Sequence, residues 1–255
     1  MNGTLGVLGG MGPLASARFV YNLYELNPAR REQDLPRVLL DSDPELPDRT
    51  AAIMNGTGDV VRQRLASRVV GLLDLGATRI VVPCVTAHHF IGLMDPALRA
   101  PVVSLVDVTV SQLAQAPEPL LMLSTTGTRR ARIFERAPGW PSVANRVVLP
   151  SRADQELIHQ LIYQLKWKGA AAGALPIIEA LRRRYGCAGV IVGCTEFHLV
   201  SRELTAVYGP TGVVDALLTI AAGIGDLLES SPAWPAQAPP DAEQTEPDRG
   251  GEQSH

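Results

Sequence analysis

The sequence predicts an α/β protein of two similar, pseudo-symmetric domains, each a small parallel sheet flanked by helices, with the active site between them. Short β-branched runs alternate with helical patterns, as expected for parallel sheets. Two segments, Gly76–His88 and Gly186–His198, also repeat one spacing: cysteine follows glycine by eight residues, and histidine follows cysteine by four. This repeat, 110 residues apart, indicates a duplicated unit with a thiol at matching strand ends.

The first half begins with an apolar run that leads into Gly9-Gly-Met-Gly12. Pro13 suits the first turn of the following helix, where its missing N–H would be unpaired in any case. Apolar side chains at helical spacing predict a later helix over 59–75. The elements predicted here are strands at 4–8, 38–40, 80–82 and 102–105, and helices at 13–26, 59–75 and 88–98.

The second half repeats the alternation of strands and helices. Its predicted elements are strands at 120–123, 147–149 and before Cys194, and helices at 129–136, 155–166, 175–185 and 215–228. We expect residues 1–105 plus 207–230 to form the first domain and 106–206 the second. Several prolines among polar residues predict a disordered tail at 231–255.

The bulk composition describes an ordinary soluble protein. A formal net charge of -3, with no basic run, gives no reason to expect nucleic acid as a partner. The sequence has neither an export signal nor a long apolar segment, so no membrane association is expected. Three cysteines do not suit a disulfide framework and favour a reducing cytoplasm. No close pair of cysteines or histidines indicates a metal site.

The two cysteines at the strand ends, Cys84 and Cys194, are the candidate catalytic residues. Ligands of open α/β sheets bind beyond the carboxyl ends of the strands. A thiol has an ordinary pKa of about 8.5, close enough to neutrality to act as acid or base. Two thiols on opposite faces of a carbon acid could remove and donate a proton and so invert the stereocentre. For His88 and His198 we favour pairing with backbone or core polar groups over tuning of the thiols.

The sequence resembles the cofactor-independent aspartate/glutamate racemases, in particular their aspartate racemase branch, from Leu5 to about Leu228. The motifs that carry the resemblance are Gly-Val-Leu-Gly-Gly-Met-Gly-Pro-Leu-Ala at 6–15, Leu-Pro-Asp-Arg-Thr-Ala at 46–51, Pro-Cys-Val-Thr-Ala-His at 83–88, Thr-Thr-Gly-Thr at 125–128 and Gly-Cys-Thr-Glu at 193–196. Their joint occurrence in this order is specific, although each alone is weak.

The resemblance implies an isomerase of amino-acid metabolism that uses no cofactor, with Cys84 and Cys194 as the acid/base pair. It also implies that Arg49 pairs with a substrate carboxylate, for which the guanidinium fork is suited, and it suggests a homodimer. Of the two lysines that end one helix, Lys166 is chosen over Lys168. The implied substrate-binding residues are Met11, Arg49, Thr50, Val85, Thr86, Ala87, Thr126, Lys166 and Thr195.

Two positions depart from the family pattern. Val85 stands where the family usually has asparagine, so a polar contact to substrate is missing, and Asp43 stands where it often has asparagine. An added acid at that position would disfavour a second substrate carboxylate. Together these changes predict a small carboxylate substrate other than free aspartate.

Three other functions remain open. Gly10-Met-Gly12-Pro-Leu-Ala15 after a strand also fits the dinucleotide-binding pattern of an NAD-dependent oxidoreductase. Within the same superfamily, Cys84 alone could serve as the nucleophile of a decarboxylase or cis–trans isomerase. A ligand-binding homologue without catalysis is the third alternative. The remaining thiol, Cys187, is expected to be a small buried hydrophobe.

Overall fold

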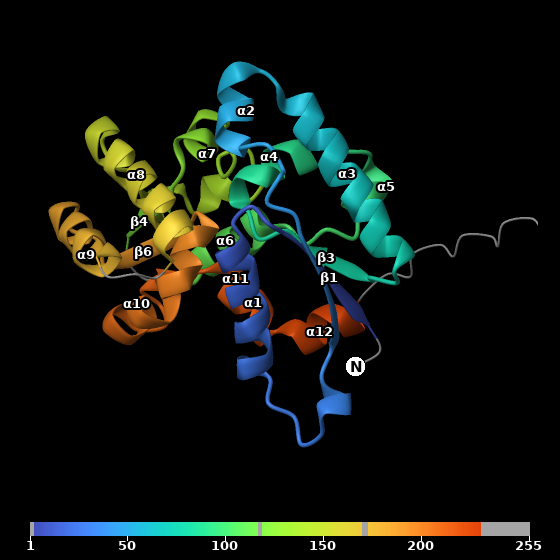
Figure 1. Cartoon of the computed structure of the whole chain (residues 1–255). Coiled ribbons are helices and arrows are strands. Elements are labelled where there is room, and N and C mark those ends of the chain that lie inside the picture. Colours follow the sequence, from blue (N-terminus) through green and yellow to red (C-terminus); the bar gives the residue numbers. More distant parts are fainter. Residues whose placement is uncertain (1–2, 117–118, 170–172, 231–255) are drawn as a thin grey trace, which may run out of the picture.

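The structure, a computed structural model, describes residues 3–116, 119–169 and 173–230 (Figure 1). The tail expected at 231–255 lies outside the described residues. Within the described part of the chain, no helix is long and apolar enough to cross a membrane.

The first half contains a parallel sheet of order β2-β1-β3. Its strands are β1 (Thr4–Gly9), β2 (Arg37–Ser42) and β3 (Arg79–Val81). A parallel bridge between Ile80 and Val102 adds a fourth position beyond β3. The strand predicted at 102–105 is therefore a single bridge, because the chain turns into a helix at Leu105.

The second half repeats this arrangement. Its parallel sheet has the order β5-β4-β6-β7, formed by β4 (Leu120–Ser124), β5 (Val147–Val148), β6 (Gly189–Gly193) and β7 (Val213–Val214). In each half the first strand is central, the second lies on one side, and the third and fourth lie on the other. The repeated strand order is the structural counterpart of the repeated glycine, cysteine and histidine spacing, and it confirms the predicted fold class.

Alternating side chains of the strands enter two separate cores, as the two-residue period of a strand requires. Along β4, Leu120 and Met122 belong to a central cluster that the two halves share, whereas Leu121 and Leu123 face the outer helices of the second half. Along β1, Val7 likewise faces the central cluster. The sheets thus enclose a common apolar layer and carry further helices on their outer faces.

Figure 1 shows these layers. The central layer is lined mainly by α1 (Pro13–Leu26), α6 (Leu105–Leu113) and α11 (Ala216–Ala222), and also by residues of the last helix, at 224 and 228. The first sheet is covered outside by α3 (Gly58–Asp74), with α2 (Arg49–Asn55), α4 (His88–Ile91) and α5 (Pro96–Arg99) nearby. The second carries α8 (Arg152–Lys168), α9 (Ala174–Arg184) and α10 (Ser201–Tyr208), and α7 (Thr126–Arg130) and α12 (Ile224–Glu229) complete the α-helices described.

Several predicted helices differ from the observed ones. The helix predicted at 88–98 is two short helices, α4 and α5, and the one at 215–228 is divided at Gly223. The helix predicted at 129–136 is instead α7, which begins earlier and ends at Arg130; Arg132 then adopts a φ of 51°, which a right-handed helix does not allow. Neither α2 nor α10 was expected.

The segment 207–230 contributes to both halves. We expected it in the first domain, yet β7 pairs with β6 of the second sheet, in the position that Val102 takes beside β3. The helix α11 of the same segment packs against α1. We therefore propose that this segment is shared between the two domains.

Candidate active site

The two repeated cysteines lie at equivalent places in the two sheets. Cys84 follows β3 and precedes a short 3-10 helix, η2 (Val85–Ala87), and Cys194 follows β6 and precedes η5 (Thr195–Val200). Both are free and almost fully buried, with 6% and 5% of their surface exposed. Both thiols thus occupy the carboxyl ends of parallel strands, where α/β proteins bind their ligands.

Direct hydrogen bonds join the two cysteine turns across the halves. The Thr195 hydroxyl donates to the carbonyl of Pro83, at 2.9 Å, so the residue after one cysteine bonds to the residue before the other. The Thr86 hydroxyl lies 3.0 Å from each of the Thr125 and Thr128 hydroxyls. Both threonines, which were expected to bind substrate, therefore bond within the protein. Thr195 joins the two cysteine turns, whereas Thr86 joins the Cys84 turn to the start of α7.

Arg49 is buried beside Cys84. Its Nη1 donates to the carbonyls of Leu46 and Pro47, at 3.1 and 3.0 Å, and its Nη2 to the carbonyl of Met11, at 2.9 Å. Its Nε is buried without a hydrogen-bond partner among the described residues. Burial alone would lower the pKa of Arg49, but its electrostatic interaction and hydrogen bond with Cys84, and then the charges of Asp48 and Glu196, raise it. The site therefore holds a fixed cation whose charge the three carbonyl oxygens do not cancel.

Glu196 gives Cys194 a different environment. The Cys194 thiol donates to Oε2 of Glu196, at 2.8 Å, while Oε1 is buried without a hydrogen-bond partner within the described ranges. A Cβ atom at Gly12 would lie 2.9 Å from that Oε1, so a residue with a side chain would crowd the carboxylate. Burial, and then the charge of Glu196, raise the pKa of Cys194 well above its ordinary value. Cys194 is thus a protonated thiol at neutral pH.

Lys166 reaches the site from the second half. Its Nζ lies 3.9 Å from Oε1 of Glu196 and 3.9 Å from Oδ2 of Asp48, while Lys168 is exposed. Tyr163 donates to the same Asp48 oxygen at 2.9 Å, joining α8 to the start of α2. Burial opposes ionisation of Asp48, but its hydrogen bonds from Ala51 and Tyr163 and the nearby cations lower its pKa.

The other predicted binding residues have varied surroundings. Val85 is buried in the central cluster, and Ala87 in the outer core of the first half. Thr50 packs against Gly127. A Cβ atom added at Gly127 would lie 2.9 Å from the Cα of Thr50. The Thr126 backbone N–H donates to Nδ1 of His159, at 3.4 Å, so this part of Thr126 is engaged with α8.

The two repeated histidines serve mainly as structural hydrogen-bonding groups, as expected. The Leu105 N–H donates to Nε2 of His88, so Nδ1 carries the proton and donates to the Cys84 carbonyl at 3.1 Å. Burial lowers the pKa of His88, which keeps it neutral. His198 contacts the Asp215 carboxylate and the Asn22 amide inside the protein.

The sequence interpretation missed Glu196, Asp48 and Tyr163. Glu196 and Asp48 stand inside two of the quoted motifs, each next to or near a residue that was assigned a role. Their place inside those motifs was the available signal. Tyr163 lies 115 residues from Asp48 in sequence, and no local pattern indicates that pairing.

Comparison with known proteins gives one consistent family. The sequence model of the Asp/Glu/hydantoin racemases matches residues 8–222. The broad-specificity amino-acid racemase RacX of Bacillus subtilis is 22% identical over 194 residues, which cover 69% of this chain and 83% of that protein.

Solved structures share the fold of this chain. The aspartate racemase of Picrophilus torridus aligns with a TM-score of 0.75 at 24% identity, over 90% of this chain and 94% of its own. A glutamate racemase from Campylobacter jejuni aligns with a TM-score of 0.58 at 16% identity, over 89% of this chain and 84% of its own. From the family match over most of its length, the chain belongs to the Asp/Glu/hydantoin racemase family of isomerases.

Proposed function

We propose that this protein is a cofactor-independent amino-acid racemase in which Cys84 and Cys194 exchange protons with the substrate α-carbon from opposite faces. The observation that carries this proposal is the difference between the two thiols. A fixed guanidinium lies beside Cys84, whereas Cys194 donates to the Glu196 carboxylate. One sulfur has a cation at hand for a thiolate, and the other is held as a proton donor.

The proposed reaction has two linked proton transfers. The Cys84 thiolate removes the α-proton of one enantiomer, leaving a carbanion stabilised by the neighbouring carboxylate of the substrate. The Cys194 S–H bond then breaks as its proton forms the new C–H bond on the other face. The products are the opposite enantiomer, a Cys84 thiol and a Cys194 thiolate, and the reverse reaction restores the starting state.

We further propose a small acidic amino acid as substrate, although not necessarily aspartate. Arg49 supplies a cation for a carboxylate. Oε1 of Glu196 is buried, accepts no hydrogen bond among the described residues and already faces the Lys166 ammonium at 3.9 Å, so it is an acceptor suited to an ammonium group. Asp43 forms ion pairs with Arg64 and Arg68, at 2.9 and 2.5 Å, so it repels a second carboxylate less than the sequence suggested. The broad specificity stated for the Bacillus relative is consistent with a substrate set wider than aspartate.

The test is α-proton exchange in deuterium oxide, over a panel of L- and D-amino acids, for wild type, Cys84→Ser and Cys194→Ser. Loss of an acid or base should lower racemisation by about 10²–10⁴-fold. Cys84→Ser and Cys194→Ser should each retain exchange only from the enantiomer whose proton faces the remaining thiol. Cys187→Ala is the matched control, since Cys187 is buried against the backbone at Tyr185. Equal activity in both serine variants would exclude the two-thiol mechanism.

The same experiment separates this proposal from the single-thiol alternative. A decarboxylase or cis–trans isomerase that relies on Cys84 would tolerate Cys194→Ser. Dinucleotide binding has less support, because the Glu196 carboxylate faces Gly12 at the start of α1, where a pyrophosphate would meet negative charge. Quenching of NADH fluorescence on titration with the protein would reverse that judgement.

A further inference from the structure

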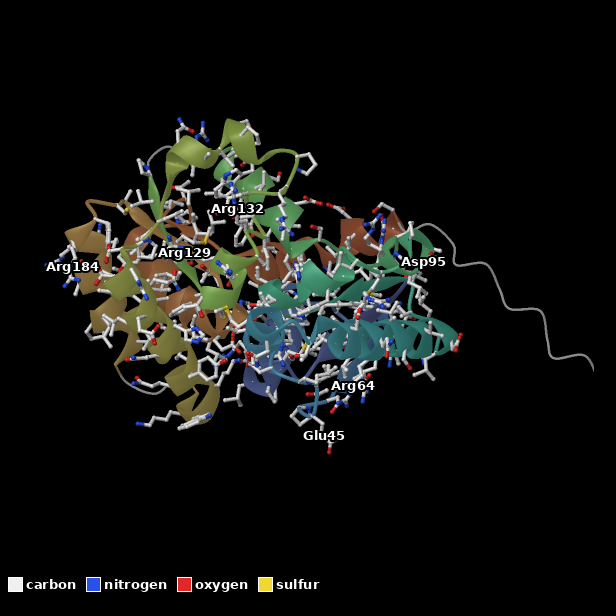
Figure 2. The ribbon with its side chains drawn as sticks, turned by 90° about the horizontal axis from the view of Figure 1, so that it is seen from above. Glu45, Arg64, Asp95, Arg129, Arg132 and Arg184 are labelled. Carbon is white, nitrogen blue, oxygen red and sulfur yellow. The ribbon has the colours of Figure 1, made fainter. Side chains whose placement is uncertain are left out.

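A cavity of about 550 Å³ opens between the two halves and is lined by neither Cys84 nor Cys194. One wall consists of residues of α4 and α5 from the first half and of α6 from the shared layer, and the other wall is the segment of the second half that follows α7. Asp95, at the start of α5, and Arg132, in that segment, are labelled in Figure 2 and locate the elements of the two walls. None of the residues proposed for proton transfer or substrate binding lines this cavity.

Two arginines, one from each half, give the cavity a cationic character. Arg136 has no ion pair or side-chain hydrogen bond within the described ranges. Arg99 donates one hydrogen bond to the Gly92 carbonyl, at 3.1 Å, and forms no ion pair with a carboxylate among the described residues. A single carboxylate, that of Asp107, lines the same cavity. Burial, and then the charge of Arg136, lower the pKa of His89, so His89 adds no positive charge at neutral pH.

The rest of the lining suits an apolar body. Ile91, Val106 and Ile133 are buried side chains of this wall. A cavity of this size fits the range in which small-molecule sites occur, where apolar walls are combined with a few charged groups. Guanidinium groups bind carboxylates and phosphates in particular, because their fork of N–H donors matches those oxygens.

His88 connects the cavity to Cys84. It lines the cavity, and its Nδ1–H donates to the Cys84 carbonyl, while its Nε2 accepts from the Leu105 N–H at 3.1 Å. Both hydrogen bonds fix the imidazole between the cavity wall and the turn that carries the thiol. A ligand that displaces the imidazole must therefore disturb the Cys84 backbone.

We propose that this cavity is a second ligand site, which binds a small organic anion with an apolar body between Arg99 and Arg136, and that its occupancy changes the reactivity of Cys84 through His88. This goes beyond the proposed racemase activity. A ligand held by one arginine from each half would also link the two halves, in addition to the hydrogen bonds at the cysteine turns.

Binding is tested by calorimetric titration of the full chain with phenylacetate and with phenyl phosphate, which separate a carboxylate from a phosphate preference. Matched probes are 2-phenylethanol, which lacks the charge, and inorganic phosphate, which lacks the apolar body. We expect saturable binding of one anionic probe at least, with weaker binding of both matched probes. Loss of a charged hydrogen bond in Arg136→Gln or Arg99→Gln should weaken that binding by about tenfold.

Arg152→Gln is the control, because Arg152 is exposed at the start of α8 and lies outside the cavity. It should bind as wild type does. The proposal is overturned if wild type binds neither anion, if 2-phenylethanol binds as tightly, or if both cavity variants bind like wild type. The last result would place the anion elsewhere, for example at Arg49.

The link to Cys84 has its own readout, which does not depend on any racemase activity. The alkylation rate of Cys84 by iodoacetamide is followed by peptide mass spectrometry, with and without the bound probe. We expect the probe to change this rate in wild type and in Arg152→Gln, but not in Arg136→Gln. An unchanged rate at saturating probe would remove the coupling step and leave a binding site alone.

Discussion

Glu196 and burial both hold the proton on Cys194, but a substitution can separate their effects. In Glu196→Gln the charge is lost while the shape is kept, so the pKa of Cys194 should fall. It should stay above its ordinary value, because burial is the larger cause of the shift. The thiolate absorbance of a Cys84→Ser/Cys187→Ala protein, in which Cys194 is the only cysteine, measures this change against pH.

The matched control for that measurement is Glu203→Gln, an exposed glutamate of α10. It should leave the titration of Cys194 unchanged. A Glu196→Gln protein that titrates at the same or a higher pH would contradict the assigned role of the carboxylate. In the active protein the same substitution should weaken proton donation to substrate, because Cys194 would begin to lose its proton nearer neutrality.

At the scale of single residues, sequence reasoning could place groups that local spacing determines. Cys84 and Cys194 follow β-branched runs, so their positions at strand ends were predictable. The Thr195 hydrogen bond to Pro83 was not, because the two residues are 112 positions apart. Resemblance supplied Arg49 as a candidate, but its three carbonyl partners emerge only from the folded chain.

At the scale of elements, long amphipathic helices were predictable and short ones were not. The apolar spacing of 59–75 and 155–166 corresponds closely to α3 and α8. The helix predicted at 88–98 is divided into α4 and α5 because a new helix begins at Pro96. The Asp95 side chain caps α5 by accepting a hydrogen bond from the Ala97 N–H. The early end of α7 depends on the backbone at Arg132, for which the sequence offers no glycine as a signal.

Glu179 joins α9 to α10 and should make their packing sensitive to acid. Hydrogen bonds from Arg182 and Tyr208 lower the pKa of Glu179 to about 2. Because the folded pKa lies below the unfolded value of about 4.3, the stabilisation is complete above that pH and is lost as pH falls toward 2. Glu179→Gln should therefore lower the free energy of unfolding at pH 7, by up to about 1 kcal/mol for a partly exposed group that solvent still screens.

Urea unfolding of wild type and Glu179→Gln between pH 7 and pH 3 measures this effect. The difference between the two proteins should shrink as the pH falls. Glu229→Gln, an exposed position at the end of α12, serves as the control and should show no pH-dependent difference. A constant difference across the pH range would mean that packing, rather than the charge of Glu179, stabilises the contact.

At the scale of the whole molecule, the duplication was predictable and the contact between the halves was not. The repeated spacing indicated two like units, and the sheets do share one strand order. The shared central core and the β7 strand depend on how the units dock, which strand and helix patterns do not specify. Both thiols are nearly inaccessible in this arrangement. If they act on a substrate as proposed, we expect the halves to separate before it can reach them.

The hydrogen bond from the Thr195 hydroxyl to the Pro83 carbonyl opposes that separation, because it joins the Cys194 turn to the Cys84 turn. Thr195→Val keeps the shape but leaves the buried carbonyl unpaired, so the open state should become more populated and alkylation of both Cys84 and Cys194 should accelerate. Thr205→Val is the control, because Thr205 bonds only within α10, to the Ser201 carbonyl. Urea unfolding separates local opening from global loss of stability. If Thr195→Val and wild type are alkylated equally fast, the bond does not limit access, and opening must proceed elsewhere between the halves.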